Sequence, residues 1–317
     1  MTKYALCMGV NDYSLWATPT WTNPNLPFSV KSAEDFAQLL IDGFGFEQAN
    51  VSIMRDSWCT RGNILHGIDS LLKRARAGDV VCAYYAGHGT RIQGLAPGGQ
   101  PEPDRWYEAF LPYSGSVITD RELAALADQL EYDYVNFTLV LDTCHSGGLH
   151  AVEGAPRPLG MPLPPALNEV FISACRSLVP AGLCLEHPRS DIAGNVRTIR
   201  FENGQFVIEA DDDSHFVPRA KSTLLSACAA DQFGWHVPAI QNSILLGAFK
   251  QVINASNFNA TYADLLARIR TQADQLMTQH VRSYGPYASM QSVPQLYGQR
   301  ARMSEGFLAP WTFSIEG

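Results

Sequence analysis

Two short stretches decide the fold: AYYAGHGT at residues 83–90 and LVLDTCHSGG at residues 139–148. Each begins with apolar residues typical of a buried strand and continues into a glycine-containing loop that carries a histidine or a cysteine. In an open α/β sheet, ligands bind outside the carboxyl ends of the strands, so the loops after two neighbouring central strands meet in one crevice. We therefore expect His88 and Cys144 to lie close together at this edge of a sheet.

The two side chains suit nucleophilic catalysis. A thiol attacks an amide well only as a thiolate, and a free cysteine is mostly protonated at neutral pH, so an imidazole is needed beside it. We expect His88 to act as general base and Cys144 as nucleophile. The backbone N–H groups of Gly89 and Cys144 are the expected oxyanion hole, in which one donor lowers the barrier by about 3 kcal/mol.

The first half of the chain alternates strand-like and helix-like runs, which predicts an α/β fold on a largely parallel sheet. Ser32 and Thr60 are the expected N-caps of two helices, and Gly43 and Gly78 are their expected ends. The predicted strands are residues 4–10, 51–55, 79–86, 137–142 and 223–229, and the predicted helices are residues 32–41, 60–76, 119–130, 243–253 and 261–278.

Composition divides the chain into three regions. Residues 1–149 hold the expected catalytic residues, and residues 222–317 resume the ordered pattern. Between them, residues 150–221 are rich in proline and charge, which is typical of an insertion or linker. We expect the first and last regions to form one catalytic domain.

Charge and hydropathy exclude several classes of protein. The net charge is −8 and the basic residues are dispersed, so a nucleic-acid partner is not expected. The apolar runs have the length of strands and are too short to span a membrane, and the first residues lack the pattern of a signal peptide. The seven cysteines are an odd number without framework spacing, which indicates a reducing, cytoplasmic compartment.

The motifs Y-A-G-H-G (85–89) and D-T-C-H-S-G (142–147) resemble those of caspase-like cysteine peptidases of family C14, and those of metacaspases and their bacterial relatives most closely. The histidine precedes the cysteine by 56 residues, close to the roughly 50 expected for such enzymes. The resemblance continues through LSACAADQ (225–232), LLGAFKQVI (245–253), TYADLLARIR (261–270) and VPQLYG (293–298).

This resemblance implies a caspase-hemoglobinase fold, with a largely parallel central sheet of about six strands flanked by helices on both faces. Residues 1–149 then correspond to the large-subunit-like region and residues 222–317 to the small-subunit-like region. The implied activity is that of a cysteine endopeptidase that passes through a thioester.

The resemblance also implies a specificity pocket. Metacaspases carry an acid two residues before the cysteine, where this chain has Asp142, and another in the first helix, where Asp35 aligns; Ala86 joins them in the pocket. Buried carboxylates pair with a basic side chain and disfavour an acidic one. We therefore expect cleavage of proteins and peptides after Arg or Lys at P1, the residue before the cleaved bond.

The middle region predicts regulation by cleavage, either by the enzyme itself or by an activating protease, because exposed polar segments tolerate proteolysis. Its candidate processing sites are Arg189, Arg197, Arg200, Arg219 and Lys221.

A cysteine–histidine dyad requires no cofactor, although many metacaspases are activated by calcium. The candidate oxygen ligands are Asp104, Glu108, Asp120 and Glu122, but the doubled acid of the family is here only Asp120 followed by Arg121. Calcium dependence therefore stays open. No zinc site is expected, because the cysteines and histidines near Cys144 lack C-x-x-C spacing.

Two other functions stay open. The fold could serve as an interaction or scaffold module with a dormant dyad, or as another thiol enzyme such as an acyltransferase. The presence of both His88 and Cys144 favours hydrolysis over the first.

Overall fold

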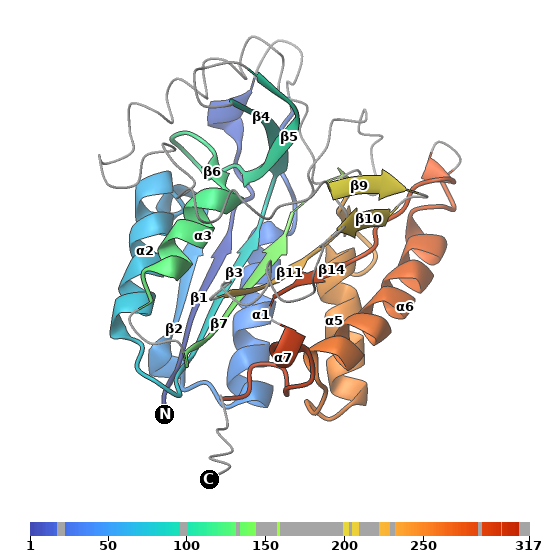
Figure 1. Cartoon of the computed structure of the whole chain (residues 1–317). Helices are drawn as coiled ribbons and strands as arrows, with labels where there is room; N and C mark the ends of the chain where they lie inside the picture. The colour runs from blue at the N-terminus through green and yellow to red at the C-terminus, as the bar shows by residue number, and fades with distance from the viewer. Residues whose placement is uncertain are drawn as a thin grey trace.

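The protein is described by a computed structural model whose placed residues are 1–17, 23–95, 101–130, 134–143, 157–158, 199–202, 205–208, 222–228, 232–284, 287–298 and 300–310. A six-stranded sheet crosses its centre in the order β14-β11-β7-β3-β1-β2 (Figure 1). Neighbouring strands are parallel except for β14, which runs antiparallel to β11. The strands are β1 (Lys3–Gly9), β2 (Val51–Arg55), β3 (Val80–Ala86), β7 (Asn136–Asp142), β11 (Ser222–Ser226) and β14 (Gln295–Tyr297). This confirms the expected α/β class and its mostly parallel sheet.

Helices cover both faces of the sheet. One face packs against α1 (Ser29–Phe44), α5 (Ile244–Ala255) and α6 (Tyr262–His280), and the other against α2 (Arg61–Arg74) and α3 (Asp120–Asp128). Successive strand residues alternate between the two hydrophobic clusters, so Tyr84 belongs to the first and Tyr85 to the second. Every residue of β3 and β7 is buried, as expected for central strands with apolar side chains on both faces.

The helix ends differ from the predictions at three of four positions. Thr60 is confirmed as the N-cap of α2, since its hydroxyl accepts a hydrogen bond from the N–H of Asn63 at 3.2 Å. Ser32 instead lies inside α1, where its buried hydroxyl donates to Asn242 Oδ1 at 3.2 Å.

The two expected helix-ending glycines have other roles. A Cβ on Gly43 would collide with the ring of Phe258, so this glycine allows close packing, and α1 ends at Gly45, whose φ is +68°. Helix α2 already ends at Arg74, and Gly78, with φ +87°, lies in the turn that leads into β3.

Among the described residues, three smaller sheets accompany the main one, and they were not predicted. The first is antiparallel and contains β4 (Gly89–Leu95), β5 (Pro101–Phe110) and β6 (Ile118–Thr119); it lies beyond the carboxyl end of β3 (Figure 1). The second contains β13 (Asn242–Ser243), β12 (Trp235–Val237) and β8 (Arg157–Pro158), and the third is the hairpin of β9 (Ile199–Glu202) and β10 (Gln205–Ile208). The other helical elements of the described ranges are η1 (Ser14–Trp16), η2 (Gln48–Asn50), η3 (Asp56–Trp58) and α7 (Arg300–Met303). Within the described ranges, no helix has the length and hydropathy needed to cross a membrane.

Candidate active site

The pairing of β3 with β7 aligns the ends of the strands that precede the two expected catalytic residues. These strands are parallel neighbours, and Ala86 at the end of β3 lies opposite Asp142 at the end of β7. His88 follows Ala86 by two residues, and Cys144 follows Asp142 by two residues. Cys144 lies outside the described residues, which stop at Thr143 on this side. The described strands therefore lead toward His88 and Cys144 from the same level of the same sheet edge.

His88 is held at three points. Its backbone N–H donates to the hydroxyl of Tyr13 at 2.8 Å, and its carbonyl accepts from the N–H of Leu111 at 2.9 Å. Its ring Nε2 lies 2.7 Å from the carbonyl oxygen of Pro24. Because a carbonyl only accepts, Nε2 must carry the hydrogen, and in the neutral ring the lone pair is then on Nδ1. The Pro24 carbonyl thus orients the buried imidazole of His88, and in the neutral ring Nδ1 is the nitrogen that can accept a proton.

Tyr13 links the restraints on His88. Its ring meets the imidazole edge-on, with centroids 4.6 Å apart, and its hydroxyl lies 2.9 Å from that of Tyr85. Its backbone N–H donates to Asn25 Oδ1 at 2.8 Å, and Asn25 directly follows Pro24 in the chain. Tyr13 therefore ties the main chain of His88 to the segment that holds its ring.

Contacts with the same two tyrosines explain why residue 87 is a glycine. A Cβ at this position would collide with the hydroxyl oxygens of Tyr13 and Tyr85. The glycine before the histidine in Y-A-G-H-G is therefore required by packing against the hydroxyl groups of Tyr13 and Tyr85.

Asp142 is fully buried, and one of its two carboxylate oxygens accepts hydrogen bonds. Oδ2 accepts hydrogen bonds from the hydroxyls of Tyr84, at 2.7 Å, and Ser243. Oδ1 is buried and has no hydrogen-bond partner within the described part of the chain. Burial raises the pKa of Asp142 to about 6, against the lowering effect of the two hydroxyl donors. The group is a desolvated acid with one acceptor oxygen that no described residue pairs.

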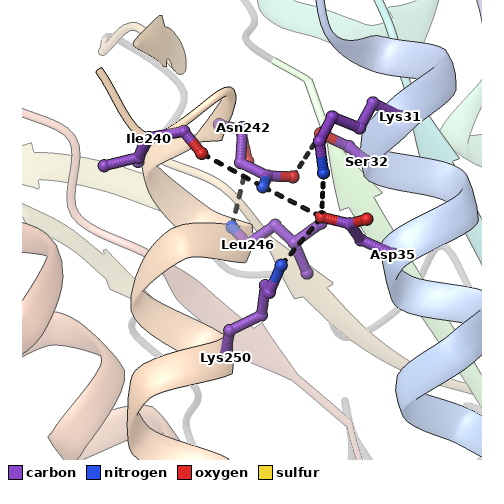
Figure 2. A network of polar contacts seen from close by, with 8 residues as sticks. Lys31, Ser32, Asp35, Ile240, Asn242, Leu246 and Lys250 are labelled. Atoms are coloured by element: carbon purple, nitrogen blue, oxygen red, sulfur yellow. Dashed lines mark hydrogen bonds and ion pairs between the residues drawn. The ribbon is translucent and has the colours of Figure 1, made fainter. Parts of the chain in front are cut away.

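Asp35 has a different environment (Figure 2). Its Oδ2 accepts from Lys31 and Lys250, both at 2.7 Å, and from Asn242 Nδ2 at 3.0 Å. Partial burial would raise its pKa, but the bonds from Lys250, Lys31 and Asn242 outweigh burial and lower the pKa. Asp35 is therefore a charged acid already paired with two lysines, one on α1 and one on α5.

A polar network joins the two acids. Asn242 donates to Asp35 and accepts from Ser32 (Figure 2). The adjacent Ser243 caps α5 and donates to Asp142. Each of the two residues of the short strand β13 therefore donates a hydrogen bond to one of the two acids. Sequence reasoning missed Asn242 and Ser243, as well as Tyr13, Tyr84 and Pro24, because nothing in their local pattern marks a long-range contact.

The other candidate residues have these positions. Ala86 is buried opposite Asp142, and Gly89 begins β4 opposite Phe110. Arg200 lies on β9, paired with Val207, whereas the other processing candidates, Arg189, Arg197, Arg219 and Lys221, are outside the described residues.

The calcium candidates do not form a described site. Glu122 is committed to a buried ion pair with Arg61, so it does not fit the role of a cation ligand. Asp104 and Glu108 lie on β5, and Asp120 begins α3. The side chains of these three residues are not among those that the structure describes. Among the described side chains, no three His, Cys, Asp or Glu are grouped as a metal site would require.

Comparison with solved structures agrees with this fold. Similar folds occur in the crystal structure of protein GSU0716 from Geobacter sulfurreducens, with a TM-score of 0.62, 19% identity, and coverage of 98% of this chain and 100% of that chain. Caspase-1 from Spodoptera frugiperda has a TM-score of 0.54 at 8% identity, over 94% of this chain and 88% of that chain. The fold is therefore that of caspases.

The sequence comparisons define the family. The caspase domain of peptidase family C14 matches residues 2–302, and this chain belongs to that family.

Among curated proteins, Metacaspase-4 of Arabidopsis thaliana is 29% identical over 154 residues, covering 47% of this chain and 34% of that protein. Metacaspase-1 of Schizosaccharomyces pombe is 28% identical over 156 residues, covering 46% and 34% respectively. The chain thus matches about a third of the length of these relatives.

Proposed function

We propose that this chain is a cysteine endopeptidase of the metacaspase type, in which Cys144 is the nucleophile and His88 the general base. The observation that carries the proposal is the fixed imidazole of His88, with Nε2 bonded to Pro24 and its lone pair on Nδ1, at the end of β3. This arrangement is what a thiol on the next strand end needs to lose its proton.

The proposed reaction has two halves. In the first, the Cys144 thiolate attacks the scissile carbonyl carbon, and the N–H groups of Gly89 and Cys144 stabilise the oxyanion. The carbon–nitrogen bond then breaks, His88 gives its proton to the leaving amine, and a thioester is left. In the second, His88 takes a proton from water, the hydroxide attacks the thioester, and the thiol is released.

We infer a preference for Arg or Lys at P1 from the buried carboxylate of Asp142. Its Oδ1, which no described residue pairs, offers a site for a basic side chain, and a second acid brought beside this buried carboxylate would meet a like charge. Asp35 and Ala86 complete the proposed pocket. The contribution of Asp35 is smaller, because its Oδ2 is already bonded to Lys31 and Lys250.

The test uses purified wild-type, Cys144→Ala and His88→Ala chains with four fluorogenic peptides that differ only at P1: Arg, Lys, citrulline and Asp. Citrulline matches Arg in shape and lacks its charge. We expect turnover by the wild type alone, with Arg and Lys far ahead of citrulline and Asp. Hydrolysis retained by Cys144→Ala would refute the dyad, and a preference for Asp would refute the pocket.

Regulation by cleavage is proposed for residues 150–221, between the two parts of the catalytic domain, 1–149 and 222–317. Of the five basic candidates, Arg200 is placed within a paired strand, and pairing shields a peptide bond from a protease. We therefore expect cleavage after Arg189, Arg197, Arg219 or Lys221 before Arg200. Mass spectrometry of wild-type and Cys144→Ala chains would distinguish self-cleavage from cleavage by another protease, and a fully active uncut chain would refute maturation.

A further inference from the structure

Asn242 is a buried residue that uses both halves of its side-chain amide (Figure 2). Its Nδ2 donates to Asp35 Oδ2 at 3.0 Å and to the carbonyl of Ile240 at 3.3 Å, and its Oδ1 accepts from the hydroxyl of Ser32 at 3.2 Å. A carboxylate and a carbonyl only accept, so these partners fix which end of the amide is the nitrogen. An acid at this position would meet the charge of Asp35, and an apolar residue would make none of these bonds. Position 242 therefore needs a side chain that both donates and accepts.

The contact between Asn242 and Asp35 is strengthened by charge. The carboxylate of Asp35 is paired with Lys31 on α1 and Lys250 on α5, both at 2.7 Å. A hydrogen bond to an ionised acceptor is about twice as strong as one between neutral groups. Asn242 and Lys250 thus bond the same oxygen of Asp35, which fixes β13 and α5 against α1.

Ser243 is positioned by its neighbour Asn242, because the two residues share one rigid peptide unit. The hydroxyl oxygen of Ser243 accepts the N–H of Leu246 at 2.9 Å, as the N-cap of α5. The hydrogen of the same hydroxyl is donated to Asp142 Oδ2. A displacement of Asn242 would therefore move one of the two hydroxyl donors of Asp142.

Tyr84, the other donor of Asp142, is linked to Asn242 through Ser32. The hydroxyl of Tyr84 donates to Asp142 Oδ2 at 2.7 Å, and the side chain of Ser32 is hydrogen-bonded to this same hydroxyl. Ser32 also donates to Asn242. The bonds form a closed ring, which runs from Asn242 through Ser32 and Tyr84 to Asp142 and returns through Ser243.

This ring determines how the carboxylate of Asp142 is turned. The last torsion of an aspartate side chain has broad minima, so the rotamer alone does not fix the plane of the carboxylate. In a buried place its direction depends on the donors that bond it, and both described donors of Asp142 belong to the ring.

We propose that Asn242 is a positioning residue for selectivity at P1: it holds the two hydroxyl donors of Asp142 in place and makes no contact with the substrate. The proposal rests on the peptidase function and the P1 preference proposed above, and adds to them a residue behind the pocket. The support that Asp35 gives to the pocket then passes through Asn242. Loss of Asn242 should reduce the preference for Arg over citrulline, because the charge of Arg gains less from a carboxylate that is no longer held in one direction.

The experiment compares wild type with Asn242→Leu, Asn242→Asp and a double variant that combines Asn242→Asp with Asp35→Asn. Leu has similar bulk without the amide, while Asp keeps the shape and brings a second charge to Asp35. In the double variant the amide and the carboxylate exchange places, so a donor faces an acceptor again. We expect the ratio of kcat/KM for Arg to that for citrulline to fall about tenfold in both single variants, as for the loss of one hydrogen bond to a charged group, and to recover in large part in the double variant.

Asn136→Leu is the matched control. Asn136 is also buried, its Nδ2 donates to the carbonyl of Ala309 at 2.7 Å, and its Oδ1 accepts from Thr138 and Tyr262, both at 3.1 Å. It lies at the end of β7 remote from Asp142. Its replacement should lower the melting temperature as the Asn242 variants do, while the ratio for Arg over citrulline stays within about twofold of wild type.

Two further measurements separate the ring from the dyad and from folding. The rate at which iodoacetamide alkylates Cys144 reports the dyad and should stay within about twofold of wild type in every variant. Ser32→Ala removes a smaller group and breaks the ring between Asn242 and Tyr84. It should lower the ratio about threefold, because a hydrogen bond between neutral groups contributes less than one to a charged group.

The role of Asn242 would be overturned by an unchanged ratio in a folded single variant, by equal losses for Arg and citrulline, or by a double variant no better than Asn242→Asp. If neither single variant folds, Ser32→Ala decides, and an unchanged ratio there would refute the ring. A wild-type chain that hydrolyses none of the peptides, or that prefers Asp, would instead refute the proposed function.

Discussion

Replacing Tyr13 by Phe removes one oxygen atom and tests how His88 is positioned. The hydroxyl of Tyr13 accepts the backbone N–H of His88 at 2.8 Å, and it lies 3.2 Å from the carbonyl of Leu111. Without it, a buried N–H loses its acceptor, and an unsatisfied buried donor costs about 1–3 kcal/mol. We expect the free energy of unfolding to fall by about 2 kcal/mol.

The same change should slow catalysis. The Phe ring still packs against the imidazole and the bond from Nε2 to Pro24 remains, but the backbone N–H of His88 loses the hydroxyl that accepts its hydrogen bond. A shift of about 1 Å in a catalytic group can cost about a hundredfold in rate, so we expect kcat to fall between about tenfold and a hundredfold with little change in KM.

Tyr262→Phe is the matched control. Its hydroxyl is also fully buried, 2.6 Å from Thr138 Oγ1 and 3.1 Å from Asn136 Oδ1, at the end of β7 remote from Asp142. Urea denaturation should show a similar loss of stability in both variants, while initial rates should fall only in Tyr13→Phe. The positioning role of Tyr13 would be refuted if both variants lost stability and both kept the kcat of wild type.

Three further predictions follow from the described contacts. Because burial raises the pKa of Asp142 to about 6, its carboxyl is neutral below that value, so the ratio of kcat/KM for Arg to that for citrulline should fall as pH drops through about 6 and be flat in Asp142→Asn. Gly87→Ala should lower kcat through the clash with the two tyrosine hydroxyls, whereas Gly62→Ala, on α2 with open space around it, should raise the melting temperature slightly. Glu122→Gln should lower the free energy of unfolding by about 3 kcal/mol in urea titrations, because it leaves the buried charge of Arg61 unpaired; a loss below about 1 kcal/mol would contradict this.

The parts of the fold that the sequence predicts well are those with a local physical cause. The strand at Val51–Arg55 has the predicted bounds, and β3 and β7 are buried on both faces as their continuous apolar runs indicate. Thr60 caps its helix because the cap needs only a hydroxyl three residues before a free N–H.

The predictions that were wrong concern residues whose roles depend on contacts with distant parts of the chain. Ser32 looks like a cap, but its hydroxyl is used by Asn242, which lies 210 residues further along the chain. Gly43 looks like a helix end, but it makes room for Phe258. The Pro24 carbonyl that orients His88 has no side-chain signature at all, since any residue could offer this oxygen. These contacts exist only once the chain has folded.

The two adjacent tyrosines of β3 show how one strand serves both halves of the proposed chemistry. Tyr84 points to the face that holds Asp142 and donates to its carboxylate, while Tyr85 points to the opposite face and supports Tyr13, which holds His88. The alternation of a strand therefore separates the acid from the base.

The two phenylalanine variants at these positions should consequently differ in kind. Tyr84→Phe removes a donor that lowers the pKa of Asp142, so the pH at which the preference for Arg over citrulline is lost should move above about 6, with kcat at high pH little changed. Tyr85→Phe should lower kcat and leave that midpoint in place, because its hydroxyl touches only the support of His88. Profiles of kcat/KM against pH for both substrates separate the two effects. A midpoint that moved equally in both variants would show that the two faces of β3 are not independent.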